Sequence, residues 1–338
     1  MTEQLAAVVQ KARTEVTIKA LRAEGVYDEE RGVFECGPET VAIPVTRPPV
    51  ATDVREVVVD QTQTAPETLS DLLGEWGWSK AELDRAPASW AVVGSVVLVR
   101  VTDVPRPEEV GEALLALVGG VDTVLARSSI DGPHREPDVT VLAGEGDTET
   151  VHREHGTEYA LDLSEVMFSP GNQAERTRMG ERVQTGERVL DTFAGIGYFT
   201  LPIARAGATV TAVERNPAAF AYLVENVVRN GVADSVETYR ADCRDVVDGF
   251  AAGTTFDRVV MGHYDAHGYL ADTLAVLAPG GTVHVHATTP EKLLPERPTR
   301  RVRRAVDGTG RTVDSMAVRH VKTYSEGVSH VVVDAVFE

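Results

Sequence analysis

The second half of the chain alternates apolar runs with amphipathic stretches. Five apolar runs are typical of buried strands and lie at 187–193, 209–214, 236–242, 256–262 and 281–287. Helical periodicity marks 199–207 and 217–231, and each of these stretches ends at a glycine. Strand–helix alternation with short connections predicts an α/β fold with a doubly wound, mostly parallel sheet.

The first half has a different pattern. Apolar residues from Leu5 to Leu21 predict a helix that ends near Gly25, followed by extended pieces at 41–45 and 57–59. Further on, three apolar runs predict strands at 90–101, 121–129 and 138–145, 107–118 predicts a helix, and the mixed stretch 148–164 suggests a hairpin. These are features of small α+β domains.

These patterns predict three domains. Residues 1–62 form a small N-terminal α+β domain, 63–178 a second α+β domain, and 179–338 the α/β domain. The polar stretch 61–67 reads as the linker between the first two.

Length and composition exclude several protein classes. The 338 residues contain no apolar run close to the roughly 20 residues that span a bilayer, and the first 15 residues lack the apolar stretch of a signal peptide. We therefore expect a cytoplasmic protein. Two cysteines, Cys36 and Cys243, are too few for a disulfide framework or a cysteine zinc site, and His284 and His286 alone make no metal site, so we predict none.

The charge is strongly acidic. The chain has 52 acidic and 33 basic residues, a net charge of −19, and only five of the basic residues are lysines. A basic partner is one interpretation. An acidic, lysine-poor surface that stays hydrated in the molar salt of a halophilic archaeon fits better. Because the Debye length is about 3 Å at 1 M salt, this acidity does not exclude a nucleic-acid partner.

The strongest chemical signal is the segment from Asp191 to Phe199, DTFAGIGYF, at the end of the first strand of the α/β domain. Gly195 and Gly197 allow a ligand to approach the backbone closely. Glu214 ends the next strand, where an acid can accept hydrogen bonds from ribose hydroxyls, and Asp242 ends the third.

The same segment argues against a dinucleotide. Position 200 is Thr200 rather than the third glycine of a dinucleotide fingerprint, which disfavours a dehydrogenase. Asp191, before the loop, is unhelpful beside a pyrophosphate but suits a cationic ligand. The pattern therefore favours S-adenosylmethionine over NAD. The structural alternative is that these acids are only strand-end turns and helix caps.

With these motifs, from about residue 90 to the C-terminus, the sequence resembles the archaeal and eukaryotic family that modifies position 37 of tRNA beside the anticodon. The motifs that carry the resemblance include Leu142-Ala143-Gly144-Glu145, Phe168-Ser169-Pro170, Glu175-Arg176-Thr177-Arg178, DTFAGIGYFTLP, Glu214-Arg215-Asn216-Pro217 and the segment 328–334. The resemblance implies a class I S-adenosylmethionine-dependent, Rossmann-like fold preceded by smaller α+β domains.

That family has two branches. One contains guanine-37 N1-methyltransferases; the other moves the 3-amino-3-carboxypropyl group of S-adenosylmethionine onto C7 of 4-demethylwyosine during wybutosine biosynthesis. Methyltransferases of the family carry an arginine after Ser-Pro and an Asn-Leu-Pro motif after the fourth strand. This chain instead has Gly171-Asn172 and Met261-Gly262-His263-Tyr264, which resemble the aminocarboxypropyl branch. One alternative is the methyltransferase of the same family. The other is a non-catalytic RNA-binding scaffold, and the complete set of acids and glycines argues against this scaffold.

The resemblance also implies site residues. Ser169 and Arg176 contact the cofactor, Glu214 binds ribose, and Asp242 with Cys243 flanks the adenine. The loop supplies the remaining cofactor contacts, Asp191, Phe193, Gly195 and Gly197. Arg176 suits bidentate pairing with the methionine carboxylate, unless it is a surface helix charge, and Ser169 is otherwise a helix cap. Tyr198 and Phe199 line the pocket or belong to the core. The catalytic candidates are His263, Tyr264 and Asn172.

An RNA partner requires basic residues on the surface. The densest run contains Arg297 and four predicted RNA-binding residues, Arg300, Arg301, Arg303 and Arg304. Arg178 belongs to a second run. Phosphate contact is the functional interpretation, and a solvated turn balanced by acids is the alternative. The resemblance implies tRNA-Phe as partner and no obligate protein partner.

Overall fold

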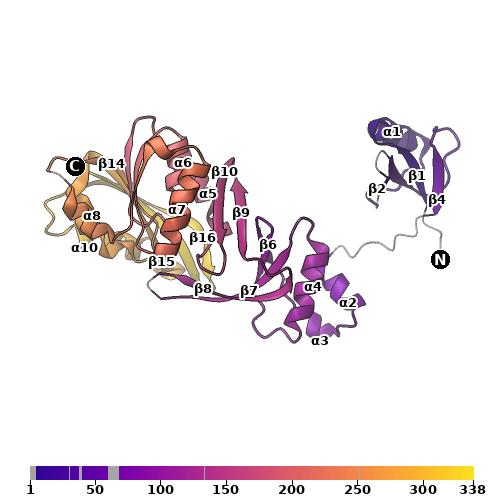
Figure 1. The fold of residues 1–338 in the computed structure, drawn as a ribbon, viewed down its shortest axis with the longest axis horizontal. Helices are drawn as coiled ribbons and strands as arrows, with labels where there is room; N and C mark the ends of the chain where they lie inside the picture. Colours follow the sequence, from indigo (N-terminus) through magenta and orange to yellow (C-terminus); the bar gives the residue numbers. More distant parts are fainter. Residues whose placement is uncertain (1–4, 30, 38–39, 60–67, 133, 251) are drawn as a thin grey trace. The chain divides into compact units, whose positions relative to one another are not determined.

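The computed structural model describes residues 5–29, 31–37, 40–59, 68–132, 134–250 and 252–338. The chain divides into two compact units, residues 1–71 and 72–338, whose elements are labelled in Figure 1. The predicted linker 61–67 lies outside the described residues, and the predicted domain boundaries stay predictions. No described helix is both long and apolar enough to cross a membrane.

The N-terminal unit is a four-stranded sheet with one helix. Its strands, in the order β2-β3-β1-β4, are β1 Leu5–Gln10, β2 Phe34–Gly37, β3 Thr40–Val45 and β4 Glu56–Val59. Helix α1 spans Thr14–Glu24 and ends at Gly25 in the left-handed conformation, as predicted. The helix prediction is wrong before Lys11, because β1 lies between β3 and β4 and buries Ala6 to Val9 on both faces. Burial on both faces removes the alternation that marks a strand.

The larger unit begins with a small four-stranded sheet, β5-β6-β7-β8. The β-rich run 90–101 forms an antiparallel pair of strands, β5 and β6, because Gly94 adopts a φ of 58° and makes the turn between them. The predicted hairpin at 148–164 is confirmed as β9 and β10. The elements of this region are α2 Leu69–Glu75, α3 Lys80–Leu83, β5 Trp90–Val93, β6 Val96–Val99, α4 Pro107–Leu117, β7 Thr123–Asp131, β8 Glu136–Gly144, β9 Glu149–Glu154 and β10 Thr157–Asp162.

The main sheet has seven strands in the order β13-β12-β11-β14-β15-β17-β16. The first five are parallel, which confirms the predicted doubly wound sheet, and β17 runs antiparallel to both of its neighbours. The strands are β11 Arg188–Asp191, β12 Thr209–Val213, β13 Val236–Tyr239, β14 Phe256–Met261, β15 Leu277–Pro290, β16 Val313–Ser325 and β17 Val328–Phe337.

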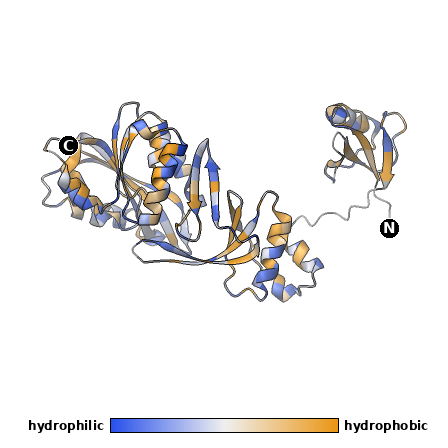
Figure 2. Ribbon diagram, in the orientation of Figure 1, coloured by the Kyte–Doolittle hydropathy of each residue, from blue (hydrophilic) through white to orange (hydrophobic). Residues whose placement is uncertain are grey.

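Helices cover both faces of this sheet. Val189 and its neighbour Leu190 on β11 point into two separate apolar cores, as the period of two in a strand requires. The helices carry both hydrophobic and hydrophilic residues in Figure 2, and their buried hydrophobic residues belong to these cores. The Val189 core includes residues of α5 Gln173–Arg182, α6 Thr200–Arg205 and α7 Pro217–Arg229, and the Leu190 core includes residues of α8 Cys243–Gly249, α9 Leu270–Thr273 and α10 Glu296–Val306. Short 3-10 turns complete the chain: η1 Lys11–Arg13, η2 Pro170–Asn172, η3 Ala233–Ser235, η4 Ala266–Gly268, η5 Leu274–Val276 and η6 Glu291–Leu293.

Candidate active site

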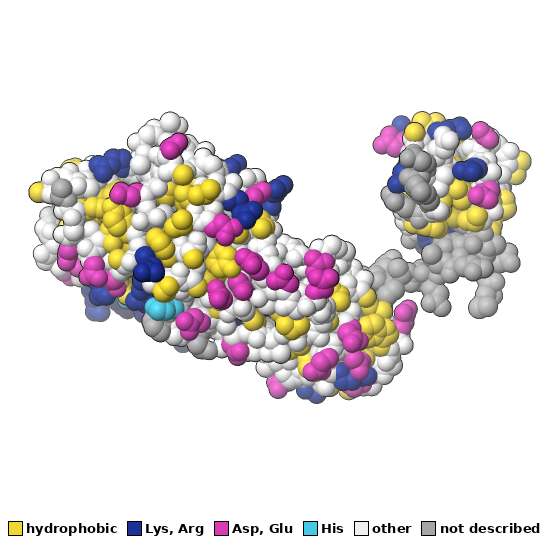
Figure 3. All heavy atoms as spheres, viewed as in Figure 1, with side chains coloured by type: hydrophobic (Ala, Val, Ile, Leu, Met, Phe, Trp, Pro, Cys, Tyr) yellow, Lys and Arg dark blue, Asp and Glu magenta, His cyan; other side chains and the backbone are white. Residues whose placement is uncertain are grey.

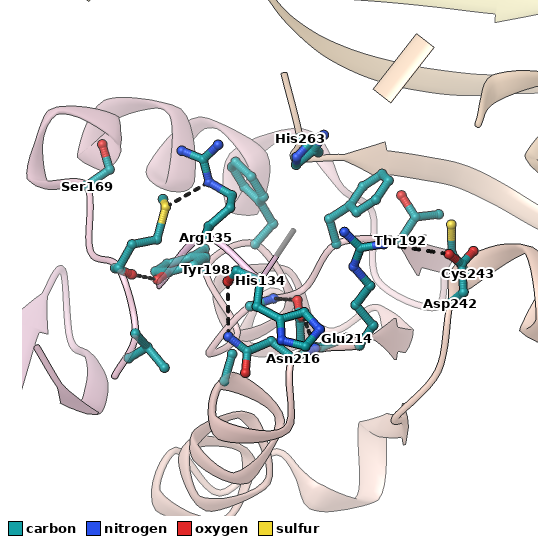
Figure 4. Close-up of a pocket in the computed structure, with 18 of the residues that line it drawn as sticks. His134, Arg135, Ser169, Thr192, Tyr198, Glu214, Asn216, Asp242, Cys243 and His263 are labelled. Atoms are coloured by element: carbon teal, nitrogen blue, oxygen red, sulfur yellow. Dashed lines mark hydrogen bonds and ion pairs between the residues drawn. The ribbon is translucent and has the colours of Figure 1, made fainter. Parts of the chain in front are cut away.

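A pocket lies at the carboxyl ends of the parallel strands of the main sheet (Figure 4). Such ends are where ligands bind in open α/β sheets. We call its two parts the strand side (Gly195, Glu214, Asp242 and Cys243) and the turn side (Met167, Ser169 and Asn172). Ser169 and Asp242 lie at opposite ends of the pocket in Figure 4. The further lining residues used below are His134, Arg135, Arg176, Phe193, Tyr198, Phe199, Asn216, His263 and Tyr269.

Glu214 is held in place by the backbone of the strand side. Its Oε2 accepts the N–H of Gly195 at 2.8 Å, and its Oε1 accepts the N–H of Asn216 at 2.7 Å. Each carboxylate oxygen can accept a further hydrogen bond, so the fixed carboxylate can receive two ligand hydroxyls. This is the arrangement expected of a ribose-binding acid.

Asp242 and Cys243 form the far end of the strand side. Asp242 caps α8 by accepting a hydrogen bond from the N–H of Arg244 at 3.0 Å. The Arg244 guanidinium donates to both carboxylate oxygens of Asp242, each at 2.9 Å. That hydrogen bonding lowers the pKa of Asp242. Burial raises the pKa of the Cys243 thiol to about 12, so Cys243 contributes a neutral sulfur and no nucleophile.

The glycine loop divides into residues that line the pocket and residues behind it. Gly195, with φ of 57°, and Phe193 line it. Gly197, with φ of 100°, lies against Leu201 of α6 and does not line the pocket.

Asp191 also lies behind the loop. It is fully buried and accepts hydrogen bonds from Thr200 Oγ1 at 2.8 Å and from the N–H of Phe193 at 3.4 Å. Burial raises its pKa to about 7. Its observed role is to hold the loop, which corrects the expectation that it faces a cationic ligand.

Arg176, on α5 beside the turn side, is a buried residue rather than a surface charge. It is 3% exposed, and its guanidinium pairs with Glu154 through Nε and Nη2, both at 2.7 Å. Its Nη1 donates to the carbonyl of Ser169 at 3.1 Å. Two guanidinium nitrogens of Arg176 are therefore engaged by Glu154, while Arg176 also lines the pocket, and its contact with the cofactor stays a prediction.

Ser169 does not act as a helix cap, because its side chain makes no cap hydrogen bond to η2. Its Oγ instead accepts a hydrogen bond from Lys322 Nζ at 2.6 Å. Lys322 belongs to β16, 153 residues further along the chain.

The three catalytic candidates differ in position. Asn172 and His263 line the pocket, whereas Tyr264 does not and packs against His330 and Tyr324. Burial lowers the pKa of His263, and its Nδ1 accepts the N–H of Asp265 at 3.2 Å. A neutral imidazole whose acceptor nitrogen is engaged is poorly suited to take a proton.

Several lining residues have no sequence motif. His134 and Arg135 come from the tip between β7 and β8, and the carbonyl of His134 accepts a hydrogen bond from Asn216 Nδ2 at 3.1 Å. Arg135 Nε donates to Met167 Sδ at 3.1 Å, and Tyr198 O–H bonds to the carbonyl of Met167. The sequence patterns predict strands at 121–129 and 138–145 but indicate nothing about the turn between them, so they miss this tip. Tyr198 and Phe199, left open above, both line the pocket.

The predicted RNA-binding arginines separate into two groups. Arg178 lies in an internal ion pair with Asp334 at 2.8 Å, so an RNA contact would require breaking this pair. On α10, Pro298, Val302 and Val306 are buried. The other arginines, Arg300, Arg301, Arg303 and Arg304, are exposed or half-buried on this helix.

Comparisons with known proteins identify the family. The TRM5/TYW2 methyltransferase domain model matches residues 150–314, and the TYW2 N-terminal domain model matches residues 69–148. A Pyrococcus horikoshii protein, named tRNA(Phe) (4-demethylwyosine(37)-C(7)) aminocarboxypropyltransferase, is 39% identical over 252 residues, 73% of this chain and 88% of that protein. The chain belongs to the TRM5/TYW2 family. The family resemblance seen in the motifs is thereby confirmed.

Solved structures of TRM5/TYW2 proteins extend this result to the fold. Pyrococcus horikoshii TYW2, crystallised in complex with MeSAdo, aligns with a TM-score of 0.67 at 35% identity over 80% of this chain and 97% of that chain. Trm5b from Pyrococcus abyssi aligns with a TM-score of 0.74 at 28% identity over the whole of both chains. The predicted class I S-adenosylmethionine-dependent fold with preceding smaller domains is confirmed.

Proposed function

We propose that the chain transfers the 3-amino-3-carboxypropyl group of S-adenosylmethionine to C7 of 4-demethylwyosine at position 37 of tRNA-Phe. The observation that carries the proposal is the turn side of the pocket. Its Gly171-Asn172 sequence resembles the aminocarboxypropyl branch, and Asn172 lines the pocket together with Glu214. The name of the Pyrococcus horikoshii relative, of which the chain covers 88%, supports the same branch.

The residues present fit S-adenosylmethionine. Glu214 offers two fixed acceptors for ribose hydroxyls, and the neutral Cys243 with Phe193 offers an apolar surface for the adenine. When bound, S-adenosylmethionine supplies an electrophilic carbon beside its sulfonium: the C7–Cγ bond forms as the Cγ–S bond breaks, methylthioadenosine leaves, and the C7 proton is lost.

The chain's own part in this reaction is mainly positioning. The tip of β7–β8, the turn side and the glycine loop enclose the pocket and hold ligand groups in place, which favours a displacement that needs near in-line approach. Aromatic rings of Phe193 and Tyr269, 5.2 Å apart, form part of this wall. We assign His263 to the wall as well, since its Nδ1 is engaged and burial lowers its pKa.

The tRNA contact we propose uses α10. Among the described residues, the arginines at 300, 301, 303 and 304 have no carboxylate within ion-pair distance. Arginines without internal partners are suited to phosphate oxygens. The region before the main sheet, residues 63–178 as predicted, assists by bringing the β7–β8 tip to the pocket.

The setting we propose is the cytoplasm of an organism with high internal salt, as in halophilic archaea. The net charge of −19 and the five lysines support it, and acidic side chains are spread over the face shown in Figure 3. At molar salt, screening leaves contacts between arginine and phosphate effective only at short range.

Mass spectrometry of tRNA tests the function directly. The protein is incubated in high salt with S-adenosylmethionine labelled separately on the methyl and on the methionine carboxyl group, with tRNA carrying either 4-demethylwyosine or unmodified guanine at position 37. We expect the carboxyl label on the tricyclic base and release of methylthioadenosine. Methyl label on guanine would establish the methyltransferase instead, and no label on either RNA, with cofactor bound, would favour the non-catalytic scaffold.

A further inference from the structure

Lys322 is a cation without a carboxylate partner beside the turn side. Its Nζ donates to Ser169 Oγ at 2.6 Å, and no acidic side chain of the described chain lies within ion-pair distance of it. It is half-buried on β16. A partly buried, unpaired ammonium is costly, so its position indicates a ligand that supplies negative charge.

The neighbouring charges make this excess positive charge larger. Arg176 is neutralised by Glu154, whereas Arg127 on β7 donates to the carbonyl of Phe168 at 3.4 Å and has no ion pair with a carboxylate of the described residues. Burial, with Arg176 and Arg127 nearby, lowers the pKa of Lys322 to about 8. Binding an anion here would therefore relieve an existing strain between like charges.

The absence of a side chain at Gly171 leaves space for the Lys322 side chain. A Cβ at position 171 would lie 3.1 Å from Lys322 Cδ and 3.4 Å from its Nζ. Gly171 itself is exposed and does not have a positive φ, so its lack of a side chain matters for this contact rather than for the backbone. The Gly-Asn sequence thus leaves room for the lysine to reach Ser169.

Asn172 provides an independent sign of a ligand. It lines the pocket, and its Oδ1 is buried with no hydrogen-bond partner within the described chain. A buried acceptor without a donor is rare and costs about 1–3 kcal/mol. Ser169 is therefore contacted by a cation without a carboxylate partner, Lys322, and a buried acceptor without a donor, Asn172 Oδ1, follows it three residues along the chain.

We propose that Ser169, Lys322 and Asn172 form a receptor for the zwitterionic amino-acid end of S-adenosylmethionine. Ser169 Oγ accepts from Lys322, which leaves its own O–H free to donate to the carboxylate, and Asn172 Oδ1 accepts from the ammonium. Lys322 is a positioning residue that acts through Ser169 and adds its charge. The inference rests on the proposed function for the identity of the cofactor.

Binding calorimetry with two ligands tests this receptor. S-adenosylmethionine carries the amino-acid end, and methylthioadenosine has the same nucleoside without it. We expect Lys322→Met to weaken S-adenosylmethionine about tenfold or more and to leave methylthioadenosine within about twofold, since one charge-assisted contact is lost only where the carboxylate is present. Lys292→Met, at an exposed lysine of η6, is the matched control and leaves both affinities unchanged.

A third ligand separates the two ends of the zwitterion. Decarboxylated S-adenosylmethionine keeps the ammonium, so Asn172→Ala should weaken it about as much as S-adenosylmethionine, whereas Lys322→Met should leave it unchanged. Lys322→Arg should restore part of the affinity for the carboxylate-bearing ligand, and this variant keeps the test open if the methionine substitution impairs folding.

Two outcomes would overturn the receptor. Equal losses for S-adenosylmethionine and methylthioadenosine would assign Lys322 a general structural role. An unchanged cofactor affinity together with weaker tRNA binding would assign it to a phosphate. The proposed function fails separately: wild-type protein that transfers no aminocarboxypropyl group, but whose cofactor affinity depends on Lys322, would refute the function and keep the receptor.

Discussion

The strand side and the turn side of the pocket are built in opposite ways. On the strand side, three consecutive parallel strands end at the same edge, and Glu214 is fixed by two backbone N–H groups of adjacent loops. On the turn side, Ser169 depends on Lys322, which lies 153 residues away in sequence, and Arg176 depends on Glu154. One side is held by local backbone, and the other by side chains from distant segments.

This difference separates two kinds of recognition. Under the proposed function, Glu214 and the backbone of the strand side bind the nucleoside of the cofactor. The proposed receptor of Ser169, Lys322 and Asn172 would bind the amino-acid end that the nucleoside carries. Substitutions on the two sides should therefore affect ligands with and without the amino-acid end differently.

The largest effect is expected on the strand side. Glu214→Ala removes the acceptors of the predicted ribose hydroxyls, and leaves the N–H groups of Gly195 and Asn216 without their partner. We expect S-adenosylmethionine and methylthioadenosine to bind about 1–3 kcal/mol more weakly, with similar losses for both, as measured by calorimetry. Glu181→Ala, at an exposed glutamate of α5, is the control. Unchanged affinities would remove Glu214 from the site.

The second effect is on stability. In Gly195→Ala, the new Cβ would lie 2.4 Å from the Tyr198 ring at a φ of 57°, whereas Gly186→Ala meets nothing within 4 Å at a φ of 83°. Both variants incur backbone strain of about 1 kcal/mol, and only the first adds a clash. Guanidinium unfolding should show Gly195→Ala to be less stable than Gly186→Ala. Equal stabilities would mean that the Tyr198 ring moves aside freely.

The third prediction concerns Asp191 and pH. Burial raises its pKa to about 7 in the folded protein, so between about pH 4 and 7 the folded state keeps a proton that the unfolded state releases. Its contribution to stability is therefore full below about pH 4 and is lost as the pH rises through 7.

Asp191→Asn should remove this dependence, so that the stability of the variant relative to wild type rises between pH 4 and 7 and is level above. Unfolding midpoints measured across this range check it. Asp234→Asn, at an exposed aspartate, is the control. Parallel profiles for wild type and Asp191→Asn would show that Asp191 ionises normally.

The smallest effect is expected on the turn side. Gly171→Ala places a Cβ 3.1 Å from Lys322 Cδ and should turn that side chain away from its preferred torsion. We expect S-adenosylmethionine to bind about two- to tenfold more weakly and methylthioadenosine to bind as before. Gly119→Ala, where a Cβ meets nothing within 4 Å, controls for the added methyl group. Equal losses of affinity for S-adenosylmethionine and methylthioadenosine would show that the turn side does not recognise the amino-acid end separately from the nucleoside.

Sequence patterns predicted the strand side well because its residues are local. Strand ends, glycines and acids recur at a spacing that the parallel sheet imposes, so Gly195, Glu214 and Asp242 could be placed before the structure. Asp191 and Gly197 follow the same pattern but support the loop from behind, because only packing decides which face of a turn is buried.

The turn side could not be predicted in the same way. Lys322 belongs to no motif, and its distance from Ser169 depends on β16 pairing with the antiparallel edge of the sheet. The only sequence signal is that it is one of five lysines in a chain that otherwise uses arginine. The same limit applies to Arg135, which reaches the pocket because two nine-residue strands carry the β7–β8 tip there.

The hydrogen bond from Asn216 Nδ2 to the His134 carbonyl connects the β7–β8 tip to the strand side of the pocket. Asn216 caps α7 through the N–H of Ala218, so one side chain joins the hairpin, the helix and the loop that holds Glu214. Opening the pocket at this wall breaks a contact next to the nucleoside end. One amide side chain thus ties the β7–β8 tip to the loop that fixes Glu214, a residue 80 positions further along the chain than His134.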